Sequence, residues 1–419
     1  MRTIIKILLT FFVLRFTLSF ITWHPDINNH VDWGIRFFEY WPEKFYRANV
    51  WSFTWPNQPP GTIYMFAGIR KLFEWVFSFF WSINISVPAF PSNIMLFFEK
   101  TLYQSLLKLP SILADLGIAY LIYKLLQEKK KKIAILGATI FLANPVVWYN
   151  STIWGQTDSV ISFFALLSVF FLLQKKIFWA LLFIALSLYI KISLIIFVPI
   201  LILFALKQKY SISGWIVGLV GIAAIFIIPS LPFVPQGKSP FVWIFEIYKD
   251  KVLTQQLHVI TANAFNLWAA IAGIHERPDT TLLGPFPYRT WGNMLFGLSY
   301  LPALFLVFKK QTLNSIVWAL GLVSFSSFML ATNMHERYIY PLFPYLTILV
   351  AQNSILLPIY IIVSTISLLG MYNFWWFPRI EPIVKIMSMG DRILPRILGL
   401  INFFSFILFY KRFLAVLKK

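Results

Sequence analysis

The sequence predicts an all-α, polytopic membrane protein with about 12 transmembrane helices and with amphipathic helices at the outer interface. Of its 419 residues, 59% are hydrophobic and 12% are charged, and the mean hydropathy is +0.73. These values lie outside the usual range of soluble domains. Aromatic residues make up 19% of the chain, a share typical of lipid-facing helices with interfacial aromatic belts.

A membrane-crossing helix needs about 20 apolar residues, although about 17 are tolerated. We expect spans at residues 4–22, 111–127, 133–148, 158–174, 177–191, 192–206, 213–229, 291–308, 313–331, 338–352, 355–372 and 392–410. Basic loops mark the cytoplasmic side. With these spans, that side holds both termini and every basic cluster: Arg2 with Lys6, Lys129 to Lys132, Lys175 with Lys176, Lys207 with Lys209, Lys309 with Lys310, and the C-terminal KRFLAVLKK.

The opposite side carries two long segments, residues 23–110 and 230–290, of what we interpret as a single domain covering residues 1–419. Residues 61–82 are apolar enough for a further span, but an arginine, a lysine and a glutamate lie at their centre, and a span there would invert every later loop. We interpret them as an amphipathic helix at the outer interface, with residues 94–110 as a second. Since the cytoplasmic loops hold little besides lysine, we expect any chemistry on the outer side.

Composition excludes several functional classes. The net charge is +20, but the basic residues lie in short tethers that suit anionic lipid rather than nucleic acid. The absence of cysteine excludes disulfides and Cys-ligated metal or redox centres. No Ser/His/Asp set, HExxH zinc pair or phosphate-binding glycine loop is evident. No cofactor is implied, and a divalent metal is not supported, because Asp26 and His30 supply only two ligands.

The first polar segment, HPDINNHVDWG at residues 24–34, follows directly on the first apolar stretch. If it opens a helix, Asp26 and His30 share a face four residues apart, whereas Asp32 is turned away. A general base needs a carboxylate beside the nucleophile in a partly dry site. Asp26 is therefore the candidate base, with His30 and Asp32 as supporting residues; a solvated loop is the alternative.

Two further segments carry candidate polar residues. In WSFTWPNQPPGTIY, residues 51–64, Trp55 with Asn57 and Gln58 would suit a sugar, although an interfacial aromatic anchor explains the segment equally well. Asp115 lies inside an expected span, where a carboxylate is costly and is usually paired or faces a polar cavity. We expect it to support the site, with a structural hydrogen-bonding role as the alternative.

The remaining candidates lie in the shorter outer loops. Trp154, Gln156 and Asp158 belong to WGQTDS, in which Asp158 could instead cap the next helix. Lys191 stands alone at the tip of a tight hairpin, where it could snorkel or bind a phosphate. The last motif is His335-Glu336-Arg337, and arginine is the natural bidentate ligand of phosphate, with His335 as a second donor.

In their order along the chain, these motifs resemble the GT-C superfamily of integral-membrane glycosyltransferases, and in particular the dolichyl-phosphate-glucose-dependent glucosyltransferases of N-glycan assembly and their prokaryotic relatives. The resemblance covers about residues 24 to 341. It consists of an acid seven residues before a tryptophan (Asp26 and Trp33), TWPNQPPGTIY, Ala114-Asp115, WGQTDS and His335-Glu336-Arg337. Two features depart from the family pattern: Asn57-Gln58 replaces an Asp-Tyr step of the eukaryotic enzymes, and Asp158 adds an acid.

The resemblance implies a GT-C-like fold and a one-step transfer of a hexose, glucose or mannose, from a polyprenyl-phosphate donor to a hydroxyl acceptor, with inversion. Asp26 would be the base, Lys191, His335 and Arg337 would bind the donor phosphate, and Trp33, Trp55, Asn57, Gln58, Trp154, Gln156 and Glu336 would contact sugar or acceptor. His30, Asp32, Asp115 and Asp158 would support catalysis. The acceptor would be a lipid-linked glycan, a polymer or a protein.

Two rival functions remain open at this point. A transporter or flippase of lipid-linked saccharides would share the many spans, but it should show comparable polar residues in its cytoplasmic half, where they are scarce. A protein O-glycosyltransferase of the same superfamily is the nearer alternative, whereas a non-catalytic membrane scaffold has no need of Asp115. We expect the chain in the plasma membrane of a prokaryote in preference to the endoplasmic reticulum, with both termini cytoplasmic and the active site external.

Overall fold

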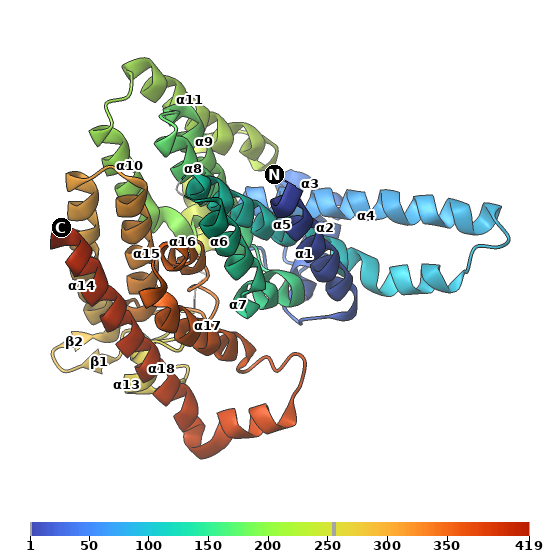
Figure 1. Ribbon diagram of the computed structural model, residues 1–419. Coiled ribbons are helices and arrows are strands. Elements are labelled where there is room, and N and C mark those ends of the chain that lie inside the picture. The colour runs from blue at the N-terminus through green and yellow to red at the C-terminus, as the bar shows by residue number, and fades with distance from the viewer. Residues whose placement is uncertain (1, 129, 254–256, 419) are drawn as a thin grey trace.

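The computed structural model describes residues 2–128, 130–253 and 257–418, and it is almost entirely helical (Figure 1). Lys129 of the expected basic cluster and residues 254–256 of the second outer segment lie outside the described residues. The first half of the chain forms α1 (Arg2–Ile21), α2 (Ile27–Glu39), α3 (Trp41–Phe45), α4 (Pro60–Ser86), α5 (Asn93–Gln127), α6 (Lys131–Ala143), α7 (Pro145–Trp148), the π-helix η1 (Tyr149–Trp154), α8 (Asp158–Leu173), α9 (Ile177–Ile190), the 3-10 helix η2 (Ile192–Phe197) and α10 (Val198–Lys207).

The second half continues with helices and one small hairpin. Its elements are α11 (Ile212–Ile227), the 3-10 helix η3 (Ile228–Phe233), α12 (Pro240–Glu246), the π-helix η4 (Ile247–Leu253), α13 (Leu267–Ala272), β1 (Leu282–Leu283), β2 (Phe286–Pro287), α14 (Tyr288–Lys309), α15 (Leu313–Leu330), α16 (Leu342–Gln352), the 3-10 helix η5 (Ser354–Leu356), α17 (Leu357–Tyr372) and α18 (Glu381–Lys418). The strands β1 and β2 pair antiparallel. Helix α18 is interrupted by non-helical residues from Met389 to Arg392.

Among the described residues, seven helices are long and apolar enough to cross a membrane. The number rises to eight if the bent pair α6 and α7–η1 counts as one span. The other expected spans fall on shorter apolar helices, namely α8, α9, η2 with α10, and α16. The chain is therefore an all-helical protein whose apolar helices are compatible with several membrane crossings.

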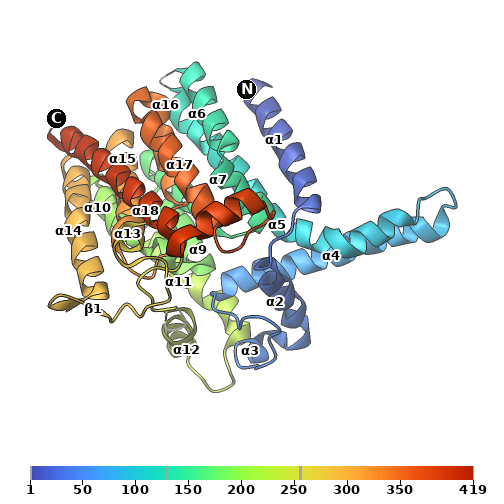
Figure 2. The same cartoon turned by 90° about the horizontal axis from the view of Figure 1, so that it is seen from below.

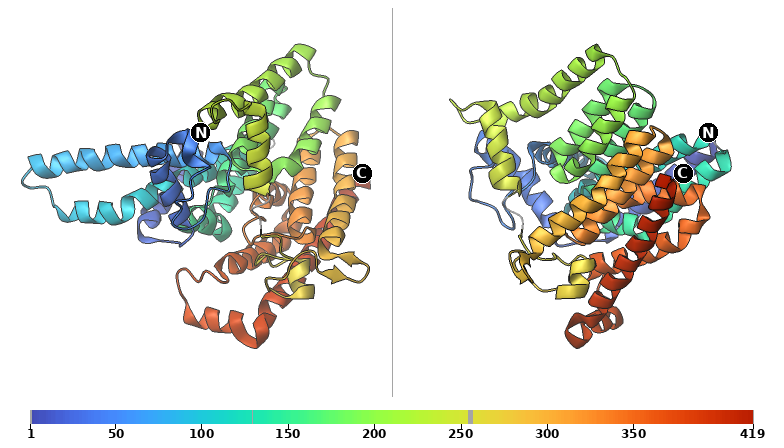
Figure 3. Two further views of the ribbon diagram at one scale, coloured as in Figure 1. Left: turned by 180° about the vertical axis from the view of Figure 1, so that it is seen from behind. Right: turned by 90° about the vertical axis from the view of Figure 1, so that its left-hand side faces the viewer.

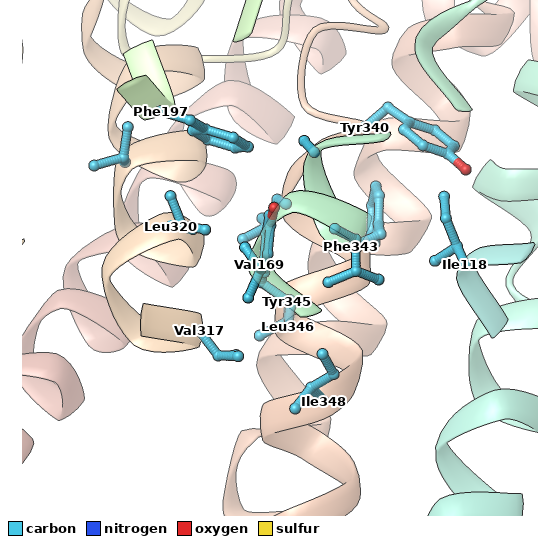
Figure 4. Close-up of a cluster of buried hydrophobic side chains, with 14 of the residues drawn as sticks. Ile118, Val169, Phe197, Val317, Leu320, Tyr340, Phe343, Tyr345, Leu346 and Ile348 are labelled. Carbon is cyan, nitrogen blue, oxygen red and sulfur yellow. The ribbon is translucent and has the colours of Figure 1, made fainter. Parts of the chain in front are cut away.

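The helical body is built around α5, which contacts α1, α4, α6 and α8. Helices α8, α9 and α11 form one side of the body, and α14, α15 and α18 form the other (Figures 1 and 3). Between them, α16 is buried along its whole length except at its last residue. Its side chains Phe343 and Leu346 lie between Val317 and Leu320 of α15 on one side and Ile118 of α5 on the other (Figure 4). This apolar core fixes the loops at the ends of its helices.

Helix α4 and the first half of α5 form a long hairpin that projects from the body (Figures 1 and 2). The prediction of a separate helix at 94–110 is wrong, because α5 runs without a break through Pro110 into the expected span at 111–127. A proline removes one helical hydrogen bond, which the neighbouring packing tolerates. Helix α4, which contains residues 61–82, is not among the helices that meet the length and hydropathy conditions for a span.

A buried ion pair joins α1 to α5. The guanidinium of Arg15 lies 2.6 Å from Asp115 Oδ2, and neither side chain is exposed. Arg15 also donates to the carbonyl of Leu142 at 2.8 Å, and the Tyr340 hydroxyl donates to Asp115. Asp115 thus connects α5 to α1 and to the turn before α16, which is the paired state that a carboxylate inside an apolar body requires.

We predict that Arg15→Met and Asp115→Leu each destabilise the protein by about 3–5 kcal/mol, because each leaves one charge buried without its partner. The double variant removes both charges and should be more stable than either single variant. Chemical unfolding in detergent, followed by far-ultraviolet circular dichroism, measures the change in the free energy of unfolding for each of the three variants. If the double variant lost as much unfolding free energy as the two single variants together, the pairing of Arg15 with Asp115 would be contradicted.

Candidate functional site

Three hydrogen bonds hold the carboxylate of Asp26 at the start of α2. Its Oδ2 accepts from Gln156 Nε2 at 2.5 Å and from Trp154 Nε1 at 3.1 Å, and its Oδ1 accepts from Asn29 Nδ2 at 2.8 Å. The side chain is only half-buried. Asp26 is therefore fixed in position and still reachable, which is what a general base requires.

The segment after α6 explains why Trp154 and Gln156 reach Asp26. Pro145 ends α6, and the chain turns by 51° into α7 and the π-helix η1. Gly155 then adopts a left-handed φ of 79°, a conformation that favours glycine. A Cβ there would lie 3.0 Å from Lys108 Cγ and 3.1 Å from Ile27 Cδ1. This close approach and the turn place the side chains on both sides of Gly155 against Asp26.

A second group of charges lies beside the first. Lys191 Nζ lies 2.7 Å from Asp158 Oδ1, and Arg337 Nε lies 3.8 Å from Asp158 Oδ2. Arg337 Nη1 lies 3.6 Å from Glu336 Oε1, and its guanidinium carbon is 5.3 Å from the centre of the Trp154 ring. We call Asp26, Asp158, Lys191, Glu336 and Arg337 the acid–cation cluster.

Arg337 is loosely held within this cluster. Both of its carboxylate distances exceed those of a strong charge-assisted hydrogen bond, which are about 2.7–2.9 Å. Its Nε is a buried donor with no hydrogen-bond partner. A buried donor without an acceptor is costly, so this guanidinium is suited to an anionic ligand.

The pKa values within the cluster differ for identifiable reasons. Burial alone would raise the pKa of Asp26, but the charge of Arg337 and the hydrogen bond from Trp154 bring it below the usual value. Burial raises the pKa of Glu336 to about 7, against the opposing effect of Arg337. Asp26 is therefore ionised at neutral pH, whereas Glu336 is close to half-protonated.

Three histidines surround the acids. The ring of His24 stacks on Trp154 with a centroid distance of 4.4 Å, and that of His30 stacks on Phe66 at 4.2 Å. Burial lowers the pKa of His24 to about 3, that of His30 to about 4 and that of His335 to about 3. All three are neutral at pH 7, so they can act as hydrogen-bonding groups but add no positive charge.

The structure brings together residues that the sequence separates by hundreds of positions. The acid–cation cluster and its immediate neighbours include the predicted residues Asp26, His30, Trp154, Gln156, Asp158, Lys191, His335, Glu336 and Arg337. Two cavities lie against it. One of about 170 Å³ is lined by His335, Glu336 and Trp375, and one of about 250 Å³ is lined by Asp158 and Tyr338.

The contacts of the other predicted residues serve to hold the chain together. Asp32 accepts from Arg36 Nε at 2.7 Å and from the backbone amide of Ser52 at 2.9 Å. Trp33 Nε1 donates to the carbonyl of Thr54 at 2.8 Å. Both therefore fasten the 51–55 segment to α2, and Asp115 belongs to the ion pair with Arg15.

Trp55, Asn57 and Gln58 have no described contact with the acid–cation cluster. Trp55 is 47% exposed, and Lys251 Nζ lies 6.0 Å from its ring centre. The amide of Gln58 donates to Asn57 Oδ1 at 3.4 Å.

His24 and Trp375 are among the residues of the site that were not predicted from the sequence. His24, two positions before Asp26, contacts Trp375 with a ring distance of 4.7 Å. Trp375 also donates through Nε1 to Glu336 Oε1 at 3.4 Å. Histidine in the first polar segment was a visible signal, but nothing local in the aromatic run NFWWF indicates that its second tryptophan reaches residue 336.

Comparison of the chain with models of known protein families gives no match, and comparison with curated protein sequences gives none. In the described part of the chain, no three His, Asp or Glu side chains come together as a possible metal site.

We predict that Glu336 titrates close to pH 7. Infrared difference spectra of the detergent-solubilised protein should show a protonated carboxyl band that disappears as the pH rises through about 7. Glu336→Gln should remove this band, whereas Glu39→Gln, at an exposed position of α2, should leave it. A band that persists in Glu336→Gln would show that another carboxyl group titrates there.

Proposed function

We propose that the protein is an inverting glycosyltransferase that moves a hexose from a polyprenyl-phosphate donor to a hydroxyl acceptor on the external face of the membrane. The observation that carries the proposal is the half-buried Asp26, fixed by three donors beside the loosely held Arg337. One group accepts a proton and the other stabilises an anion, which are the two tasks of such a transfer.

Asp26 acts on the acceptor in this reaction, and Lys191 and Arg337 act on the donor phosphate. The acceptor oxygen attacks the anomeric carbon, its proton passes to Asp26, and the bond from that carbon to the phosphate oxygen breaks with its electron pair going to the phosphate. Since the pKa of Asp26 is low, it is a weak base, and the proton moves only as the attacking oxygen gains positive charge. Lys191 and Arg337 interact more strongly with the phosphate as its negative charge grows.

Glu336 sets how firmly Arg337 is held. As a carboxylate it competes with a phosphate for the guanidinium 3.6 Å away. When it is protonated, this competition ends. With a pKa of about 7, the donor site is therefore expected to bind phosphate more tightly as the pH falls through neutrality.

The proposed topology has twelve spans, both termini in the cytoplasm and the acid–cation cluster outside. In Figure 2 the two termini lie at one end of the helical body, and α2, α3 and α12 lie at the other. Asp26 follows α1 at its C-terminal end, opposite Arg2. This arrangement supports a site on the side of the membrane opposite the termini, with the α4–α5 hairpin along the outer interface. The proposed membrane is the plasma membrane of a prokaryote.

We predict that Asp26→Asn lowers the transfer rate by about 10²–10⁴-fold, because asparagine keeps the hydrogen-bonding shape but cannot take the proton. Mass spectrometry of products measures the rate in vesicles supplied with polyprenyl-phosphate hexoses and with lipid, polymer and peptide acceptors. Asp32→Asn is the matched control, since it removes an acid six residues away, and it should remain active. Activity in Asp26→Asn together with its loss in Asp32→Asn would reassign the base.

We predict that Arg337→Lys raises the apparent KM for the donor by roughly tenfold, because lysine keeps the charge but not the two-pronged geometry that matches phosphate. Arg379→Lys, at an exposed pair with Glu381, is the control and should behave as the unchanged protein. Steady-state kinetics against donor concentration gives both values. An unchanged donor KM in Arg337→Lys would contradict the phosphate role.

A further inference from the structure

A cavity of about 250 Å³ lies against Asp158. It is bounded by η2, by α15 and by the loop after α15. Its polar lining comes from Asp158, Ser193, Ser324, Ser327, Thr332 and Asn333. None of these except Asp158 was singled out by the sequence, so the cavity is a candidate site in its own right.

Two acceptor atoms at this cavity lack donors. Asp158 is 1% exposed, and Lys191 occupies its Oδ1 at 2.7 Å. Its Oδ2 has no hydrogen-bond partner, although Arg337 Nε lies 3.8 Å away, and Asn333 Oδ1 has none either. Buried acceptors are almost always satisfied in folded proteins. Hydroxyl groups of a ligand would satisfy these two, while the serine and threonine hydroxyls can both give and accept hydrogen bonds.

The charges around the cavity favour an uncharged occupant. A carboxylate on the ligand would meet Asp158, which is already one of three acids in the acid–cation cluster. Lys191 and Arg337 do not line the cavity, but they already pair with Asp158 at 2.7 Å and 3.8 Å, so an ammonium group would compete with two cations for the same carboxylate. A carboxylate buried beside the like charge of Asp158 is strongly unfavourable.

The size and the remaining lining limit the occupant further. Pockets for small ligands usually measure roughly 300–1,000 Å³, so about 250 Å³ accommodates one small ring and not an oligosaccharide. The rest of the wall is apolar and includes Ile192, Leu194 and Met334. Such a wall suits the carbon–hydrogen face of a sugar ring, and the polar side suits its hydroxyls.

We propose that this cavity holds the glycosyl group of the donor and selects a single, uncharged sugar whose hydroxyls satisfy Asp158 and Asn333. The inference rests on the proposed function for one point, namely that the donor phosphate lies at Arg337 and Lys191. It adds that Ser327, Thr332 and Asn333 determine which sugar is used, whereas Trp55, Asn57 and Gln58 do not.

Binding of soluble sugar phosphates tests this without any transfer step. Equilibrium dialysis of the purified full-length protein against ³²P-labelled probes should show that glucose 1-phosphate or mannose 1-phosphate binds about tenfold or more tightly than inorganic phosphate. Glucuronic acid 1-phosphate and glucosamine 1-phosphate should bind about tenfold or more weakly than the neutral hexose phosphate. Equal binding of the neutral and charged sugars would overturn the proposal.

Variants locate the sugar within the cavity. Ser327→Leu should remove the preference for hexose 1-phosphate and leave the binding of inorganic phosphate unchanged. The control Ser213→Leu makes the same change at an exposed serine of α11. It should alter neither the preference for hexose 1-phosphate nor the binding of inorganic phosphate. Thr332→Val keeps the side-chain volume and removes one hydroxyl, so it should weaken the binding of hexose 1-phosphate several-fold. The unfolding temperature should stay unchanged, which separates a binding role from a folding defect.

The outcomes distinguish this inference from the proposed function. Unchanged hexose 1-phosphate binding in both Ser327→Leu and Thr332→Val would place the sugar elsewhere, whether or not transfer occurs. Cavity-dependent hexose binding without any transfer product would support the sugar site and contradict the enzyme. Transfer that requires Asp26 but is insensitive to both cavity variants would support the enzyme and contradict the sugar site.

Discussion

The buried contact between Lys191 and Asp158 is the interaction on which the site depends. It joins the end of α9 to the start of α8 at a distance of 2.7 Å, and both side chains are almost wholly buried. An ion pair withdrawn from water gains its stability only if neither partner is missing. The pair therefore fixes two helix ends, and through Asp158 it also fixes the environment of Arg337 and of the adjoining cavity.

The charged side chains around this pair differ in how closely their partners hold them, and this difference determines what the site can bind. Lys191 has a close partner, whereas Arg337 has two distant ones and a donor without an acceptor. Asp26 is held by neutral donors and not by a close cation. A site with one well-compensated pair, one loosely held cation and one accessible acid can accept both an anion and a proton without a large rearrangement.

Much of this could be predicted from the sequence because hydropathy is a local property. The apolar stretches and basic loops predict that residues 24–34, 149–158, 191 and 335–337 lie on one side of the bilayer, and residues confined to one face of a compact bundle meet. Partners of buried groups could not be predicted in this way. No local feature of the sequence indicates that Arg15 pairs with Asp115 or Trp375 with Glu336, and the expected helix boundary at residue 110 lies inside α5. The roles of Asp32 and Trp33 depend on the path of the 51–55 segment, which hydropathy does not specify.

The stereochemistry of the transferred sugar tests the central claim most directly. If Asp26 activates an acceptor for a single direct displacement, a β-linked polyprenyl-phosphate hexose must give an α-linked product. Nuclear magnetic resonance of the isolated product reads this configuration from the one-bond coupling constant between the anomeric carbon and its proton. The account predicts complete inversion. Retention of configuration, or recovery of intact donor with every acceptor class, would contradict it.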